Sequence, residues 1–182
     1  LAKDITLNLN GKTVTYGGNG VDNRFGIVAI PNWAGLAEPG LSGGKSAGFR
    51  VHGGTIEQAG YSSSCLAGQY GHAIFFHEDA TTNNDIEISN VDINVCGTAA
   101  INIRIAYRGG VHIFNNRLNS KVTHINNRHQ LEGMLIKVTK QRSDYNRIHG
   151  NTLNGGAQGG IHTTGLYNQV YDNHLAQDGL YT

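Results

Sequence analysis

Three basic residues that follow short alternating segments are the first candidates for chemistry in this chain. His77, Arg104 and Lys137 each stand three positions after an apolar residue that begins such a segment. Because alternate residues of a strand point to opposite faces, the three side chains are predicted on one outward face. Parallel neighbours would lie about 4.8 Å apart, so we expect a basic ladder that favours an anionic ligand. The residues aligned as equivalent strand starts are Ile74, Ile101, Met134 and Ile161, which adds Thr164 to the outward column.

A polysaccharide that carries uronic acid or sulfate groups suits such a face, because guanidinium and ammonium groups neutralise carboxylates and sulfates. Cleavage by β-elimination needs a group that neutralises the substrate carboxylate, a base for the adjacent proton and an acid for the leaving oxygen. We assign Lys137 as the base and Arg104 as the neutralising group or acid. His77 or Tyr107 would assist them. A solvated polar face without a ligand is the structural alternative.

Further residues near this column are predicted to bind the substrate. They are Tyr107, Arg108, Lys140, Arg142 and Trp33. Trp33 belongs to a long insertion, residues 31–48, and long insertions in compact domains tend to be functional. There Trp33 would either stack on a sugar ring or pack the insertion against the body of the protein.

Carboxylates and histidines offer two other kinds of site. Glycoside hydrolysis needs two carboxylates across the sugar, and Asp79 with a partner from another repeat is the candidate. The nine histidines show no chelating spacing. We therefore expect no cofactor, with calcium as the alternative because grouped carboxylates are its preferred ligands. These carboxylates are Asp79, Asp85, Glu87 and Asp92.

The composition excludes several classes of protein. Among 182 residues, 26 are Gly and 20 are Asn, two types that disfavour helix interiors, so a helical bundle is excluded. A net charge of +1 without a Lys/Arg run gives no reason to expect a nucleic-acid partner. No apolar run is long enough for a membrane span. Cys65 and Cys96 could form one disulfide or remain two buried thiols.

A six-residue phrase recurs along the chain, apolar at both ends and rich in Gly, Asn or Asp between them. Its copies begin at Leu9, Val51, Ile88, Ile113, Ile148 and Val170. Between successive copies lies a small residue followed by alternating apolar positions, which is typical of a strand with one buried face. In the absence of helical crossover segments, the inward side chains are buried if the chain winds as a coil whose strands stack on their counterparts one repeat earlier.

Asparagines mark the corners of this predicted coil. Asn and Gly tolerate the left-handed backbone conformation that joins one strand to the next. Stacked Asn side chains can also hydrogen-bond along a ladder. We therefore expect a structural rather than a ligand-binding role for Asn90, Asn115, Asn116, Asn151 and Asn173.

The opening segment Ile-Thr-Leu-Asn-Leu-Asn-Gly-Lys-Thr-Val, residues 5–14, resembles the first turn of pectate-lyase-like right-handed parallel β-helices. The recurring Gly-Ile followed by Ile-x-x-Asn-x-Ile/Leu resembles the repeat of that superfamily. The resemblance implies an all-β fold, a single-stranded right-handed parallel β-helix of about five to six coils. We expect one domain over residues 1–182 that is a fragment of a longer solenoid.

The superfamily includes polysaccharide lyases, glycoside hydrolases, epimerases and phage tailspikes. The placement of Lys137 and Arg104 is similar to the Lys/Arg arrangement in the family of chondroitinase B and alginate lyases, which implies elimination. We expect an extracellular or cell-surface protein, monomeric or trimeric, that binds and cleaves an anionic polysaccharide. The alternatives are a non-catalytic glycan-recognising or structural β-helix of the tailspike, adhesin or stalk type, and a glycoside hydrolase on the same fold.

Overall fold

The chain folds into β-strands only, in the part that the structure describes. This computed structural model describes residues 4–17, 26–29, 46–61, 71–76, 81–96, 99–104, 110–121, 134–139, 144–155 and 159–176. Within these ranges no helix is present and every strand pair is parallel. The prediction of an all-β fold is confirmed, and it follows from the many Gly and Asn residues, which disfavour helices.

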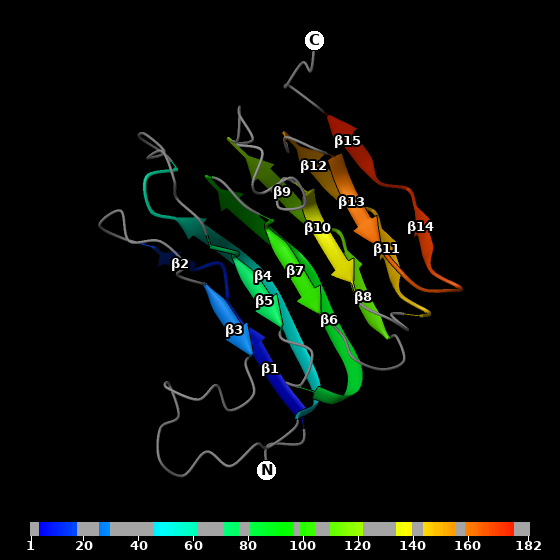
Figure 1. Ribbon diagram of the computed structural model, residues 1–182. Coiled ribbons are helices and arrows are strands. Elements are labelled where there is room, and N and C mark those ends of the chain that lie inside the picture. The colour runs from blue at the N-terminus through cyan, green and yellow to red at the C-terminus, as the bar shows by residue number, and fades with distance from the viewer. Residues whose placement is uncertain are drawn as a thin grey trace.

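Two sheets form the two layers of the molecule (Figure 1). The ten-stranded sheet contains β1 (Asp4–Asn8), β2 (Thr13–Tyr16), β4 (Ser46–Gln58), β6 (Thr81–Val95), β8 (Val111–Phe114), β9 (Arg117–Ser120), β11 (Arg147–His149), β12 (Thr152–Asn154), β14 (Gln169–Tyr171) and β15 (His174–Ala176). The five-stranded sheet contains β3 (Ile27–Ala29), β5 (Ile74–Phe76), β7 (Ile101–Arg104), β10 (Met134–Thr139) and β13 (Gly159–Thr163).

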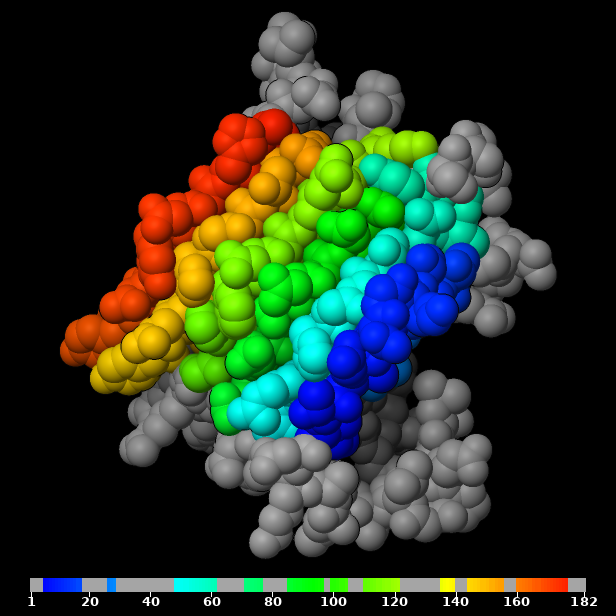
Figure 2. All heavy atoms as spheres, turned by 180° about the vertical axis from the view of Figure 1, so that it is seen from behind, coloured from blue at the N-terminus to red at the C-terminus, as the bar shows by residue number. Residues whose placement is uncertain are grey.

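The chain passes alternately through the two sheets. After β4 in the ten-stranded sheet comes β5 in the five-stranded sheet, then β6 and β7, and the later passes follow the same order. Each pass pairs with the pass before it and the pass after it, except at the two ends of the sheet, as the bands of colour in Figure 2 show on the outer face of the ten-stranded sheet. Parallel pairing with the preceding pass lets every repeat bury its apolar side against its neighbours.

The register of the ten-stranded sheet confirms most of the predicted inward positions. The last apolar residues of the six phrases lie opposite one another in neighbouring strands: Val14, Ile56, Ile93, Leu118, Leu153 and Leu175. Five of the six first apolar residues do the same: Val51, Ile88, Ile113, Ile148 and Val170. The recurring phrase is therefore the structural repeat.

In the remaining copy of the phrase, Leu9 was predicted as the first apolar position, and this prediction is wrong. Leu7 lies opposite Val51 instead. The turn between β1 and β2 contains extra residues, with Asn10 and Gly11 both in the left-handed conformation. Leu9 is buried at this corner next to Gly54, where an added Cβ would come within 2.5 Å of the Leu9 Cβ.

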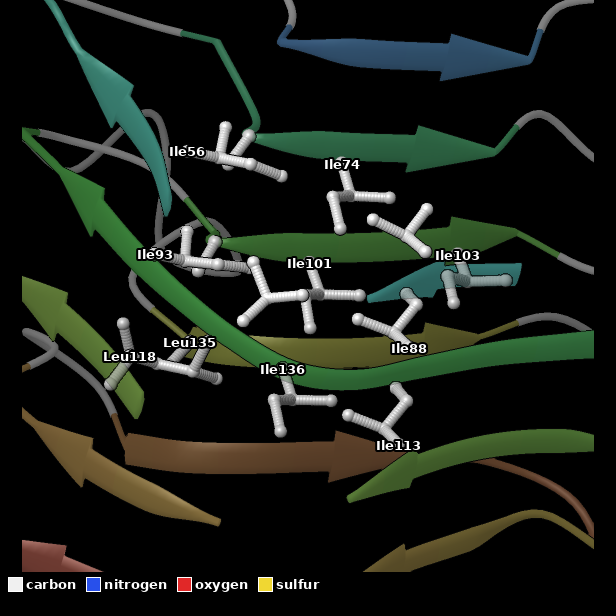
Figure 3. Close-up of a cluster of buried hydrophobic side chains, with 14 of the residues drawn as sticks. Ile56, Ile74, Ile88, Ile93, Ile101, Ile103, Ile113, Leu118, Leu135 and Ile136 are labelled. Carbon is white, nitrogen blue, oxygen red and sulfur yellow. The ribbon is translucent and has the colours of Figure 1, made fainter. Parts of the chain in front are cut away.

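The core lies between the two sheets, and isoleucine is its commonest residue (Figure 3). Ile56, Ile88 and Ile113 of the ten-stranded sheet face Ile74 and Ile101 of the five-stranded sheet, and all five are fully buried. A β-branched side chain suits a pleated strand, and each buried isoleucine contributes about 1.5–3 kcal/mol of transfer free energy. This core fixes which residues of the five-stranded sheet point outward.

Asparagine side chains hold the corners together, as predicted. Asn90 and Asn115 adopt left-handed φ values of 54° and 55°. The Asn116 backbone N–H donates to Oδ1 of Asn151 at 3.0 Å, and the Asn151 N–H donates to Oδ1 of Asn173 at 3.1 Å. These buried or half-buried amides replace the backbone partners that each chain corner lacks.

One cysteine is placed by the described structure. Cys96 follows β6, is 6% exposed and is disulfide-bonded. Cys65, the other cysteine of the chain, lies outside the described residues. Of the two predicted alternatives, the disulfide is therefore the one that Cys96 adopts.

Candidate functional site

Four side chains form a strip on the outer face of the five-stranded sheet, turned away from the core. Phe75 lies opposite Asn102, Asn102 opposite Lys137, and Lys137 opposite His162. We call Phe75, Asn102, Lys137 and His162 the outer strip. Although it faces away from the core, Phe75 and Lys137 are only 9% exposed and Asn102 is 2% exposed. Polar groups so far removed from solvent need partners in the protein or in a ligand.

This register corrects the predicted basic column. Met134 was aligned with Ile101, but Ile136 is the residue opposite Ile101. Lys137 therefore lies opposite Asn102, and Thr139 lies opposite Arg104. Lys137 and Arg104 share a face without forming one ladder.

The cause of the shift is Leu135. Residues Ala73 and Ala100 precede Ile74 and Ile101, and the corresponding position before Ile136 is taken by Leu135, which is 1% exposed. The sequence shows a small residue two positions earlier, at Gly133, and the predicted strand start followed it. A buried leucine fills the position instead, so the inward residues of β10 lie two positions later than predicted.

His72 lies beside the outer strip, just before β5, and has a single tautomer. Its Nδ1 is 3.2 Å from the carbonyl oxygen of Ala99, and its Nε2 is 2.9 Å from Nδ2 of Asn102. A carbonyl oxygen can only accept, so Nδ1 carries the proton and Nε2 accepts from the Asn102 amide. This arrangement requires a neutral imidazole.

The electrostatics of His72 agree with this tautomer and locate the two cations. Burial is the main reason that the pKa of His72 is lowered to about 4. The hydrogen bond to Ala99 acts in the opposite direction, while the positive charges of Lys137 and Arg104 lower the pKa further. Both cations therefore lie within electrostatic reach of one neutral histidine.

Two atoms of the outer strip lack a partner. Asn102 Oδ1 and His162 Nδ1 are buried and have no hydrogen-bond partner in the described structure. The orientation of the Asn102 amide follows from His72: because Nδ2 must face the imidazole, Oδ1 points elsewhere. An unpaired buried acceptor costs about 1–3 kcal/mol, so such atoms are expected where a ligand or water completes the hydrogen bonds.

Arg104 lies at the end of β7, with an exposed side chain. Its guanidinium carbon is 5.9 Å from the centre of the Phe75 ring, a cation–π distance. Phe75 thus holds the guanidinium beside the outer strip while leaving it in contact with solvent. The other predicted site residues, His77, Tyr107, Arg108, Lys140, Arg142 and Trp33, lie outside the described residues.

Two of the predicted carboxylates share one arginine partner in the described structure. Arg50 forms ion pairs with Asp85 at 3.3 Å and with Glu87 at 3.9 Å, on the ten-stranded sheet. Asp92 is exposed on the same sheet, and Asp79 lies outside the described residues. No group of three or more His, Cys, Asp or Glu side chains in the described ranges is arranged to hold a metal ion.

Sequence reasoning missed His72 and Asn102. The signal was present: an outward position flanked by Ile101 and Ile103 carries an amide, and a histidine precedes the small residue that starts the neighbouring strand. Only the register shows that the two side chains meet.

Comparison with protein-family models, with curated proteins and with solved structures found no match for this chain. None of the described residues belongs to a helix that could cross a membrane.

Proposed function

We propose that this chain is a right-handed parallel β-helix from a carbohydrate-active protein that binds an anionic, uronic-acid-containing polysaccharide and cleaves it by β-elimination. The alternation between two sheets and the parallel pairing of successive passes support the fold. The proposed site is the outer strip together with His72 and Arg104.

The observation that carries the proposal is the pair of cations beside a neutral histidine at this site. Lys137 and Arg104 both lie within electrostatic reach of His72, which stays neutral at pH 7. Asn102 Oδ1 and His162 Nδ1 remain without partners. An anionic sugar suits these groups, because its carboxylate pairs with cations and its hydroxyl groups can donate to the unpaired Asn102 Oδ1.

The proposed chemistry assigns one role to each group. Arg104 pairs with the uronate carboxylate, which stabilises the charge that develops when the adjacent carbon loses its proton. The Lys137 amine takes that proton, the electron pair forms a carbon–carbon double bond, and the bond to the glycosidic oxygen breaks. The leaving oxygen takes up a proton from water. Because Lys137 is only 9% exposed, the side chains around it must move before a substrate can reach its amine.

The same burial favours a second candidate function, glycan recognition without cleavage. Arg104 is exposed while Lys137 is not, so a glycan can contact the guanidinium without access to the amine. In that case the protein is a glycan-recognising β-helix in which Lys137 only contributes charge from below the surface.

The disulfide at Cys96 supports an extracellular or cell-surface location. Disulfides persist in oxidising compartments and are rare in the cytosol. Secretion brings the protein to the compartment where anionic polysaccharides are the abundant polymers of matrices and cell walls.

The test incubates the protein with alginate, pectate and chondroitin sulfate and follows the absorbance of the unsaturated product. We expect product from one of them, no product with Lys137→Ala, and a KM raised about tenfold or more with Arg104→Ala, because charge-assisted bonds contribute about 1.5–3 kcal/mol. Arg147→Ala, on the other sheet, is the matched control and should leave kcat and KM unchanged. Binding that depends on Arg104 without any product establishes the recognition function, and absence of binding refutes both.

A further inference from the structure

Two histidines meet on the outer face of the ten-stranded sheet, on the opposite side of the molecule from the outer strip. His112 of β8 and His149 of β11 belong to neighbouring strands. Their Nε2 atoms are 2.7 Å apart, and their ring centres are 5.0 Å apart. One Nε2 must donate a proton to the other, so at least one imidazole of the pair is neutral.

Aromatic neighbours fix the orientation of both rings. Phe114 lies 4.3 Å from the His112 ring and 5.4 Å from the His149 ring, measured between centres. Tyr171 stacks on the other side of His149 at 4.8 Å, with an angle of 8° between the rings. Stacked rings lose little further freedom when a ligand binds, which preorganises the two nitrogens.

Two charged residues lie next to the pair. Glu87 lies opposite His112 in β6, and Arg147 lies opposite it in β11. Burial is the main reason that the pKa of His112 is lowered, with further lowering by His149 and Arg147 and an opposing effect of Glu87. A lowered pKa favours the neutral form of His112, the form in which a ring nitrogen can bind a metal ion.

We propose that His112 and His149 form a two-imidazole binding site for a divalent transition-metal ion such as Cu²⁺ or Zn²⁺. The ion takes the place of the shared proton, which moves to Nδ1 of the ring that carried it so that both ligands stay neutral, and water fills the remaining coordination positions. Metal–imidazole bonds are about 2.0–2.1 Å long. With an angle between about 90° and the tetrahedral angle, two such bonds place the nitrogens about 2.8–3.4 Å apart, so the two Nε2 atoms need to separate by less than about 1 Å. The half-buried rings leave room for solvent on the outer side of the ion.

Neutral imidazole ligands make Cu²⁺ the tightest of the common divalent ions at such a site. This inference is independent of the polysaccharide proposal, because the site lies on the other sheet and uses none of the same residues. Its failure would leave the proposed function untouched.

The experiment titrates the 182-residue protein with Cu²⁺ alone and then with Zn²⁺ alone, by calorimetry and by electron paramagnetic resonance of bound Cu²⁺. We expect one saturable site whose spectrum shows coupling to two imidazole nitrogens. His112→Gln and His149→Gln should each weaken Cu²⁺ binding at least about tenfold, since even the loss of an outer-shell partner of a metal ligand costs that much. His174→Gln, an exposed histidine of β15, is the control and should have no effect.

A gain-of-affinity variant protects the test from misfolding. Arg147→Gln removes the positive charge beside the pair and should tighten Cu²⁺ binding several-fold. The absence of saturable Cu²⁺ binding would overturn the proposal. So would an unchanged affinity in both His112→Gln and His149→Gln, or an equal loss of affinity in His174→Gln.

Discussion

Removal of a single buried amide, Asn151→Ala, is expected to cost about 3–4 kcal/mol of unfolding free energy. Asn151 is 1% exposed, and its Oδ1 accepts from the backbone N–H and from Nδ2 of Asn116, both at 3.0 Å. Its Nδ2 donates to the carbonyl oxygens of Ile113 and His149 at 3.0 Å and to Oδ1 of Asn173 at 2.9 Å. One side chain thus links three successive repeats.

The magnitude follows from what the substitution leaves behind. The Asn116 N–H belongs to a residue that is 2% exposed, and a buried donor without a partner costs about 1–3 kcal/mol. Each of the other lost hydrogen bonds contributes about 1 kcal/mol or less, because the two amide hydrogens of Asn151 are shared among three acceptors. The total is a large fraction of the stability of a typical domain, about 5–15 kcal/mol.

Asn173→Ala is the matched control. Asn173 makes the same kind of contacts, since its Oδ1 accepts from Asn151 and its Nδ2 donates to the carbonyl oxygens of Ile148 and Tyr171. Because Asn173 is half-buried, water can enter the space left by its side chain and reach the Asn151 N–H, so we expect a cost near 1 kcal/mol. Urea unfolding followed by circular dichroism compares the two midpoints at constant slope. Equal losses in the two variants, or a loss below about 1 kcal/mol for Asn151→Ala, would refute the reasoning that burial makes the ladder stabilising.

Three further predictions concern stability. Thr163→Val should raise the free energy of unfolding by about 1 kcal/mol in the same urea assay, because the buried Thr163 hydroxyl has no hydrogen-bond partner in the described structure and valine has the same shape; a loss would show that the hydroxyl is satisfied. Gly11→Ala should lower the free energy of unfolding by about 1–2 kcal/mol, because Gly11 has a positive φ. Gly155→Ala should lower it clearly more: Gly155 also has a positive φ, and an added Cβ there collides with the Ser120 carbonyl oxygen, whereas Gly11 faces open space. Below pH 6.5 His72 becomes protonated in the unfolded state, but in the folded state it stays neutral down to about pH 4. The contribution of His72 to the free energy of unfolding should therefore fall by about 3 kcal/mol between these two pH values and then level off. A pH titration of stability in which His72→Gln behaves like the native protein would contradict this.

The repeat of the ten-stranded sheet was predictable because its phrase carries two independent signals. Apolar residues five positions apart mark the inward columns, and an Asn or Gly between them marks the corner. At Ile113 and Leu118 the signals agree, and the register follows. In the first repeat the turn at Asn10 and Gly11 contains additional residues, and spacing alone could not show this.

The five-stranded sheet was harder to align because its strands have only one marker, a small residue before an isoleucine. Leu135 breaks that pattern, and the predicted strand start moved to Gly133 and Met134. The outward residues of β10 shifted with it. Candidate sites on a strand depend on register more than on residue type, since an error of one pleat leaves Lys137 on the correct face opposite the wrong partner.

The histidine pair was invisible to motif reasoning for a different reason. Chelating motifs place ligands close in sequence on one element, whereas His112 and His149 are separated by 37 residues and meet through strand pairing. Only stacked repeats bring such positions together.

The spacing of the asparagine ladder has a consequence for how the protein can change in length. Partner asparagines are 35 residues apart from Asn116 to Asn151 and 22 residues apart from Asn151 to Asn173, yet the hydrogen bonds are the same. Asn146 and Asn168 form a second ladder step, also 22 residues apart. Excision of residues 146–167 would therefore put Asn168 in the place of Asn146 and leave every later contact position in frame. Recombination or gene duplication can remove or add material in such whole units, while a single-residue insertion within a strand would invert its buried face.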